Sequence, residues 1–98
     1  MEISKEIKDN KLVVKVAGRL DTTTAPELEA YLHDALDGVS DLTLDFEDLE
    51  YISSAGLRVL LATQKKMNAQ GSMRLTNVCD VVMEVLELTG FSSILTID

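Results

Sequence analysis

The chain has 98 residues, which is enough for one hydrophobic core and too few for a second domain. Its formal net charge of −8 at pH 7 argues against a nucleic acid or an anionic membrane surface as the partner, because both attract clusters of Lys and Arg. The single cysteine, Cys79, excludes an internal disulfide, and the charged start MEISKEIKDN lacks the apolar stretch of a signal peptide, so we expect a cytoplasmic chain that binds a protein of basic or mixed charge.

The first half of the chain predicts a hairpin followed by a helix. Residues 2–8 and 11–18 are typical of two strands, and Asp9-Asn10 between them tolerates the positive φ angles of a two-residue turn. In the polar connection that follows, Thr24 and Glu27 have the spacing of a capping box, and Pro26 fits the first turn of a helix. The apolar stripe of this helix is expected at Ala25, Leu28, Leu32, Ala35 and Leu36, with Gly38 at its end.

The second half predicts two units of a strand followed by a helix. Residues 41–46 alternate with the period of a strand, residues 47–52 indicate a loop, and a helix follows from about 54 to 69. The buried side of that helix is expected to hold Leu57, Leu60, Leu61 and Met67. Residues 73–77 predict the next strand, Asp80 the start of a third helix that ends at Gly90, and residues 94–97 a short edge strand.

These elements predict a fold of the α/β class in which residues 1–98 form one domain. A strand, a helix and a strand in succession imply a right-handed crossover and a parallel pair of strands. Because the strands show one apolar and one largely polar side, the sequence predicts a mixed β-sheet with the helices mainly on one face.

Polar residues follow three of the expected strands, and the carboxyl ends of parallel strands meet at one edge of a sheet. We therefore expect Asp21 to lie near Ser53 and Ser54, although by itself Asp21 is also typical of a turn that ties down local amides. Ser53-Ser54-Ala55-Gly56 stands where a loop becomes a helix, beside free backbone N–H groups that suit an anion or a phosphate. The alternative is that one of the two serines only caps the helix.

Nucleophilic catalysis, calcium binding and ATP binding by a glycine-rich loop are disfavoured, because the residues that each requires are absent from this edge. The sole histidine, His33, lies inside the first expected helix and cannot act as the base for a nucleophilic Ser54. The acidic residues between Asp45 and Glu50 lack the spacing of a calcium loop, and no glycine-rich loop with a Lys is present. The sequence thus predicts a protein that is not an enzyme and that uses no metal and no cofactor.

Three motifs together resemble the STAS domain family, which is named after sulphate transporters and anti-sigma factor antagonists. They are Gly-Arg-Leu-Asp-Thr-Thr-Thr-Ala-Pro at 18–26, Leu44-Asp45-Phe46, and Ile52-Ser53-Ser54-Ala55-Gly56-Leu57-Arg58-Val59-Leu60. The chain is similar to the stand-alone bacterial antagonists, whose shared core is Asp-Ser-(Ser/Thr)-Gly-Leu. Aligned on Gly56, the phosphorylated serine of that core falls on Ser54, its Asp falls on Ser53, and its second hydroxyl residue falls on Ala55.

The resemblance implies a partner switch controlled by phosphorylation. An unmodified antagonist binds an anti-sigma factor that is also a serine kinase, phosphorylation stops that binding, and a phosphatase can reverse it. The phosphorylated residue would be Ser54, with Ser53 as the second candidate. The residues expected to contact the partner are Asp21, Thr22, Thr23, Ser53, Ser54, Ala55, Gly56 and Arg58. The alternative is a STAS scaffold or subunit in a sensory complex or a membrane transport system, without sigma regulation.

Overall fold

A computed structural model describes all residues from 1 to 98 and shows five strands and three α-helices. The first strands and helix are β1 (Glu2–Lys8), β2 (Lys11–Leu20), α1 (Ala25–Ala35), β3 (Asp41–Asp45) and β4 (Leu49–Ile52). They are followed by α2 (Ser54–Gln70), β5 (Ser72–Thr76), α3 (Asp80–Leu88) and a 3-10 turn at Phe91–Ser93. No helix is long and apolar enough to cross a membrane.

The sheet is mixed, as the alternation of the strands predicted. Its order is β1-β2-β3-β5, and β4 pairs with β2 beyond the end of β3. The β1–β2 pair is antiparallel and joined at Asp9, which has a φ of 57°, whereas all other pairs are parallel. The register places Leu42 beside Leu12 on one side and Met73 on the other, so the apolar residues of three strands form one continuous face.

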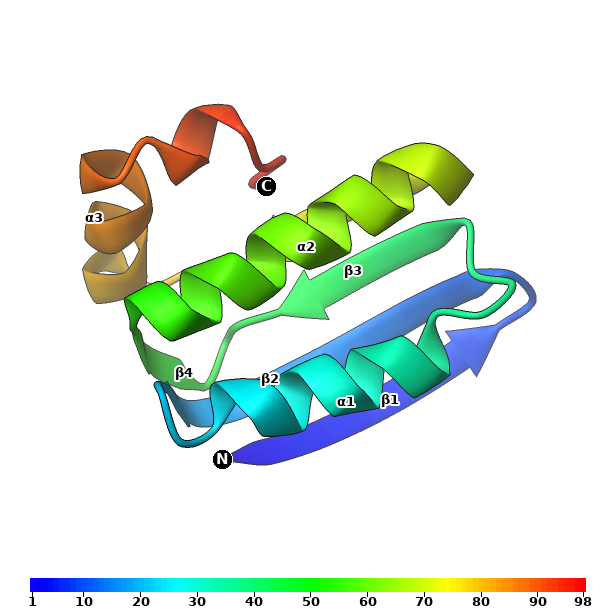
Figure 1. The fold of residues 1–98 in the computed structure, drawn as a ribbon, viewed down its shortest axis with the longest axis horizontal. Coiled ribbons are helices and arrows are strands. Elements are labelled where there is room, and N and C mark those ends of the chain that lie inside the picture. The colour runs from blue at the N-terminus through cyan, green and yellow to red at the C-terminus, as the bar shows by residue number, and fades with distance from the viewer.

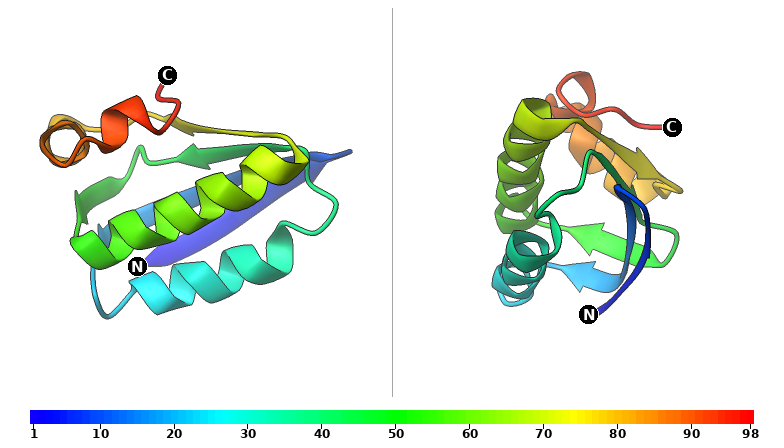
Figure 2. Two further views of the ribbon diagram at one scale, coloured as in Figure 1. Left: turned by 45° about the horizontal axis from the view of Figure 1, so that its top comes forward. Right: turned by 90° about the vertical axis from the view of Figure 1, so that its right-hand side faces the viewer.

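Helices α1 and α2 lie side by side on that apolar face, as Figure 1 and the right-hand view of Figure 2 show. The predicted stripe of α1 is buried at Ala25, Leu28, Leu32 and Leu36, whereas Ala35 is only half-buried. In α2 the buried set includes Leu57, Leu60 and Met67, and Val59 takes the place expected for Leu61, which is half-buried because α1 covers the Val59 side. The prediction of a mixed sheet with helices mainly on one face is confirmed.

The strand β2 runs two residues further than the sequence indicated, to Leu20. The pairing of β2 shifts between Gly18 and Arg19, and Gly18 has a φ of 99°, which an L side chain rarely adopts. Gly18 pairs with Leu49 and Arg19 with Tyr51, so the extra residue of this bulge is Glu50 of β4, a strand that occupies part of the segment expected to be a loop. Leu49 and Ile52, the two ends of β4, are buried and hold it in place.

The last segment also differs from the prediction. Instead of a strand at 94–97, the chain makes the 3-10 turn at Phe91–Ser93 and then a single parallel bridge between Ile97 and Leu75. Leu95 is buried in the core. Its burial favours a chain that turns back toward the core, and an extended strand at this position would not place Leu95 there. Helix α3 lies apart from α1 and α2, beside β4 at the carboxyl end of the sheet (Figures 1 and 2).

Candidate functional site

The two serines at the start of α2 have different roles. Ser53 is the N-cap: its backbone is extended, and its Oγ accepts a hydrogen bond from the N–H of Gly56 at 3.5 Å. The N–H of Ser53 also donates to the carbonyl of Leu20 at 2.9 Å, which ties the helix start to the end of β2. Ser54 is the first helical residue, is exposed, and its hydroxyl makes no hydrogen bond within the chain. The hydroxyl of Ser54 is therefore free to react.

Gly56 brings the start of α2 close to the sheet. A Cβ at this position would lie 2.8 Å from Cγ of Leu20 and 2.8 Å from Cγ1 of Ile52, both of which are almost completely buried. The absence of a side chain at Gly56 thus seats the first turn of α2 directly on β2 and β4. This contact fixes the position of the turn that carries Ser54.

Asp21 organises the connection between β2 and α1. Its Oδ1 accepts hydrogen bonds from the N–H groups of Thr23 at 3.0 Å and Thr24 at 3.1 Å. The backbone N–H of Thr24 is the main cause that holds the pKa of Asp21 below its ordinary value, with Thr23, the Thr24 hydroxyl and the charge of Arg19 acting in the same direction. Asp21 therefore accepts hydrogen bonds from the backbone amides of its own loop, which is the role that its turn position alone suggested.

The capping box expected from Thr24 and Glu27 does not form. Thr24 is the N-cap of α1, but its hydroxyl accepts from the N–H of Asp21 at 2.9 Å and donates to the carbonyl of Arg19 at 2.7 Å. Because these partners lie before the helix, the hydroxyl closes the loop and leaves the first turn of α1 without a side-chain cap.

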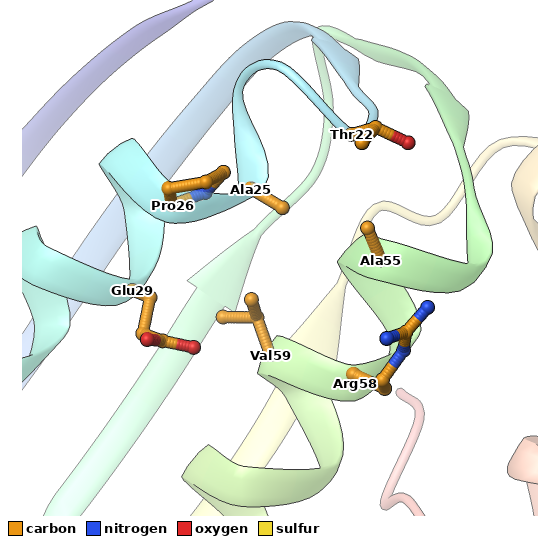
Figure 3. A pocket seen from close by; sticks show the side chains of 7 residues that line it. All are labelled: Thr22, Ala25, Pro26, Glu29, Ala55, Arg58 and Val59. Atoms are coloured by element: carbon orange, nitrogen blue, oxygen red, sulfur yellow. The ribbon is translucent and has the colours of Figure 1, made fainter.

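A groove of about 340 Å³ lies between the first turns of α1 and α2 (Figure 3). Its lining consists of Thr22, Ala25, Pro26, Glu29, Ala55, Arg58 and Val59. Three residues expected to contact the partner, namely Thr22, Ala55 and Arg58, thus share one surface next to Ser54. Thr23 is exposed in the adjacent loop, and Asp21, Ser53 and Gly56 form the turn and the helix start that support the groove.

The sequence did not single out the α1 side of this groove. Pro26 and Glu29 are three positions apart on α1 and therefore face the same way, and Val59 lies one position after Arg58 on α2. The only sequence feature that pointed to the groove was the succession of two crossover helices, because two such helices on one face of a sheet are neighbours. That signal places the helices side by side without giving the residues that face each other.

The charges around Ser54 are uneven. The first turn of α2 contains no acidic residue, whereas those of α1 and α3 contain Glu27 and Asp80. Arg58 is exposed and forms no ion pair with a carboxylate, whereas the Cζ of Arg19 lies 4.3 Å from the centroid of the Tyr51 ring. An anion at Ser54 would therefore meet the positive end of α2 and an unpaired guanidinium on the same helix.

His33, Asn77 and Cys79 do not line this groove. His33 lines a separate hollow further along α1 and α2, together with Lys66. Asn77 donates from Nδ2 to Asp45 at 3.0 Å, which joins the ends of β5 and β3, and the Sγ of Cys79 lies 3.4 Å from the carbonyl of Leu49. No group of three or more His, Cys, Asp or Glu side chains is arranged to hold a metal ion.

Comparison with known proteins identifies relatives over almost the whole chain. The family described as "STAS domain" matches residues 2–98. The anti-sigma-B factor antagonist of Bacillus subtilis (strain 168) is 31% identical over 100 residues, which covers 99% of this chain and 92% of the relative. The crystal structure of an anti-sigma factor antagonist from Mycobacterium paratuberculosis has a TM-score of 0.86 at 26% identity, covering 98% of this chain and 83% of that one.

The fold also matches SpoIIAA, the anti-sigma factor antagonist and Bacillus cell fate determinant. The TM-scores are 0.77 for its unphosphorylated form and 0.76 for its phosphorylated form, each at 20% sequence identity. The alignments cover 99% of this chain in both cases, and 87% and 91% of the respective SpoIIAA chains. The fold of this chain is thus equally similar to both forms of that protein.

Proposed function

Because the chain belongs to the STAS domain family, we propose that it is an anti-sigma factor antagonist that binds an anti-sigma factor with serine kinase activity and is switched off by phosphorylation of Ser54. The observation that carries the proposal is the free, exposed hydroxyl of Ser54 at the edge of the groove between α1 and α2. A hydroxyl in this position is open to a second protein, and the surface beside it offers that protein a hollow to fill.

Ser54 is preferred to Ser53 as the phosphorylated residue because of their different bonding. The Oγ of Ser53 accepts from the N–H of Gly56, and the residue is half-buried between β4 and α2. A phosphate on Ser53 would have to fit at a half-buried position whose Oγ already accepts from the helix start. Ser54 is exposed and its Oγ is unbonded, so neither constraint applies to a phosphate there.

In the reaction, Ser54 is a substrate and the kinase supplies the catalytic groups. The Oγ of Ser54 attacks the γ-phosphorus of ATP, the bond from that phosphorus to the β–γ bridging oxygen breaks, and ADP leaves. The hydroxyl proton passes to a base of the kinase, since His33 lies away from Ser54 in this chain. A phosphatase that hydrolyses the phosphate ester returns the chain to its binding form.

Phosphorylation would act at the docking surface without refolding the chain. The phosphate adds about −1.5 to −2 charges at pH 7, and the N-terminus of α2 favours a negative group. The added charge and bulk would stand beside the groove, where they would repel a partner that carries acidic groups and obstruct its approach. Binding is therefore expected to fall while the core remains unchanged.

The first test is a pull-down from the cell extract with ADP or ATP, followed by a kinase assay with the captured protein. We expect the captured partner to label wild-type chain and Ser53→Ala, and to leave Ser54→Ala unlabelled although that variant still binds. Labelling of Ser54→Ala as strong as that of the wild type would contradict the site. Capture of a component of a sensory or transport complex without any kinase would contradict the proposed function and favour the scaffold.

A further inference from the structure

Arg58 is the cation nearest to the start of α2 along that helix, and it has no partner. The ion pairs of the structure all involve Arg74, and the aromatic contacts of cations involve Lys5 and Arg19. Glu29 lines the opposite side of the groove but lies beyond ion-pair distance of Arg58. The guanidinium of Arg58 is thus an exposed donor of several hydrogen bonds that the unmodified chain leaves unused.

The position of Arg58 suits a group attached to Ser54. The two residues are four positions apart on α2, so their Cβ atoms are about 5–6 Å apart on the same side of the helix. Side chains on a helix lean toward its N-terminus, and Figure 3 shows the guanidinium of Arg58 extending from α2 back toward the turn that carries Ala55. An acidic group at the first position and a basic group four residues later is also the more favourable order on a helix.

We propose that Arg58 binds the phosphate of phosphorylated Ser54 within the same chain. This inference rests on the proposed function and adds the residue that fixes the orientation of the phosphate. A phosphate accepts two parallel hydrogen bonds from a guanidinium, which a hydroxyl cannot do, so the contact forms only after modification. Phosphorylation then changes the groove twice, because it adds negative charge and engages the cation that lines the groove in the unmodified chain.

The test uses chain in which phosphoserine is incorporated at position 54 during synthesis, so that no kinase is needed. The second pKa of the phosphate, which is about 6 for phosphoserine, is measured by phosphorus NMR in the Arg58 chain and in Arg58→Gln. A nearby guanidinium favours the dianion, so Arg58→Gln is expected to raise this pKa by about 0.3 unit or more, the equivalent of one i,i+4 ion pair. Arg58→Lys, which keeps the charge and loses the planar pair of donors, is expected to give an intermediate value.

Lys65→Gln is the matched control, because Lys65 is an exposed cation on the same helix. It lies eleven positions after Ser54, or about 16 Å along the axis, which exceeds the Debye length of about 8 Å at physiological salt. The proposal is overturned if Arg58→Gln shifts the phosphate pKa no more than Lys65→Gln does. That result would not contradict the proposed function. Conversely, a kinase that does not phosphorylate Ser54 would contradict the proposed function and would not affect the measured pKa of the phosphate.

Discussion

At the scale of single residues, Asp21 is the carboxylate most strongly held by its surroundings. One of its oxygens accepts from two backbone N–H groups, and the hydroxyl of Thr24 lies 3.2 Å from the same atom. These donors stabilise the ionised carboxylate and not the neutral acid, so the pKa of Asp21 is lower in the folded chain than its ordinary value of 3.8. The conformation of the loop that carries Thr22 and Thr23 is thereby linked to pH.

We predict that this link appears only in acid. A carboxyl whose pKa is lower in the folded than in the unfolded chain contributes stability that is fully present above the unfolded value and is lost as the pH falls through the folded value. The carboxyl carbon of Asp21 should therefore titrate with a midpoint below 3.8 when followed by NMR. A midpoint at or above 3.8 would contradict the role given to the Thr24 and Thr23 amides.

Asp21→Asn is the matched variant for this prediction, because it keeps the shape of the side chain and removes its charge. The difference in unfolding free energy between wild type and Asp21→Asn should be constant from pH 7 to about pH 5 and should shrink as the pH falls below 3.8. Urea titrations at several pH values measure it. A difference that does not change with pH would show that the charge of Asp21 makes no contribution.

The residues of the candidate site divide into those that local patterns reveal and those that only packing reveals. Ser53 and Ser54 stand at a helix start, so the sequence identified both but could not decide which of them caps the helix. That decision depends on the extended backbone of Ser53 and the approach of the Gly56 amide, which are properties of the folded turn. Pro26 and Glu29 were missed because their relation to Arg58 exists only across two helices.

At the scale of secondary-structure elements, the contact of α2 with β2 and β4 depends on Gly56. The two carbons that a Cβ would meet at 2.8 Å belong to the branch point of Leu20 and the inner part of Ile52, which cannot swing aside as the end of a long side chain can. A side chain at position 56 must therefore push the first turn of α2 away from the sheet. The turn that moves is the one that carries Ser54.

We predict that Gly56→Ala destabilises the chain. Overpacking costs about 1–3 kcal/mol, and the higher helix propensity of Ala returns up to about 1 kcal/mol, so a net loss of about 1–2 kcal/mol is expected. Urea-induced unfolding followed by circular dichroism measures the loss. Ser54→Ala, two positions earlier and exposed, should stay within about 0.5 kcal/mol of the wild type. An equal effect of the two substitutions would contradict the close contact at Gly56.

The elements that the sequence predicted are those with a long, regular pattern. The hairpin, the three helices and the strands β3 and β5 each repeat an apolar residue at a fixed spacing, and all are present. The strand β4 was missed because its two buried residues, Leu49 and Ile52, are three positions apart, whereas those of β3 and β5 are two apart and show the alternation of a strand. The extension of β2 past Gly18 was missed because glycine is depleted within strands and therefore predicts a strand end.

At the scale of the whole molecule, a single core joins the sheet to α1, α2 and α3. Phe46 is the largest of its completely buried side chains. The sequence contains no Trp and only two Phe, so Leu, Val and Ile fill the remaining space. Because so few large side chains are available, no neighbouring side chain can fill the volume that Phe46 occupies.

We predict that Phe46→Ala lowers the free energy of unfolding by about 3–5 kcal/mol, through lost burial and the cavity that remains. This is a large part of the roughly 5–15 kcal/mol by which a domain is stable, so the variant should unfold at a much lower urea concentration. Leu88→Ala is the control, because Leu88 is 80% exposed on α3 and its loss should change the value by less than about 0.5 kcal/mol. A loss at Phe46 similar to that at Leu88 would contradict the described core.

Under the proposed function, the groove between α1 and α2 would separate the choice of partner from the stability of the fold. Its charged side chains, Glu29 and Arg58, are exposed, whereas Ala25 and Val59 beneath them are buried. Exposed side chains can be exchanged at little cost to the fold, and charges at the rim of an interface govern which proteins associate. Under the proposed function, an exchange of these two charges would therefore redirect the chain to another partner while the buried core and Ser54 stay as they are.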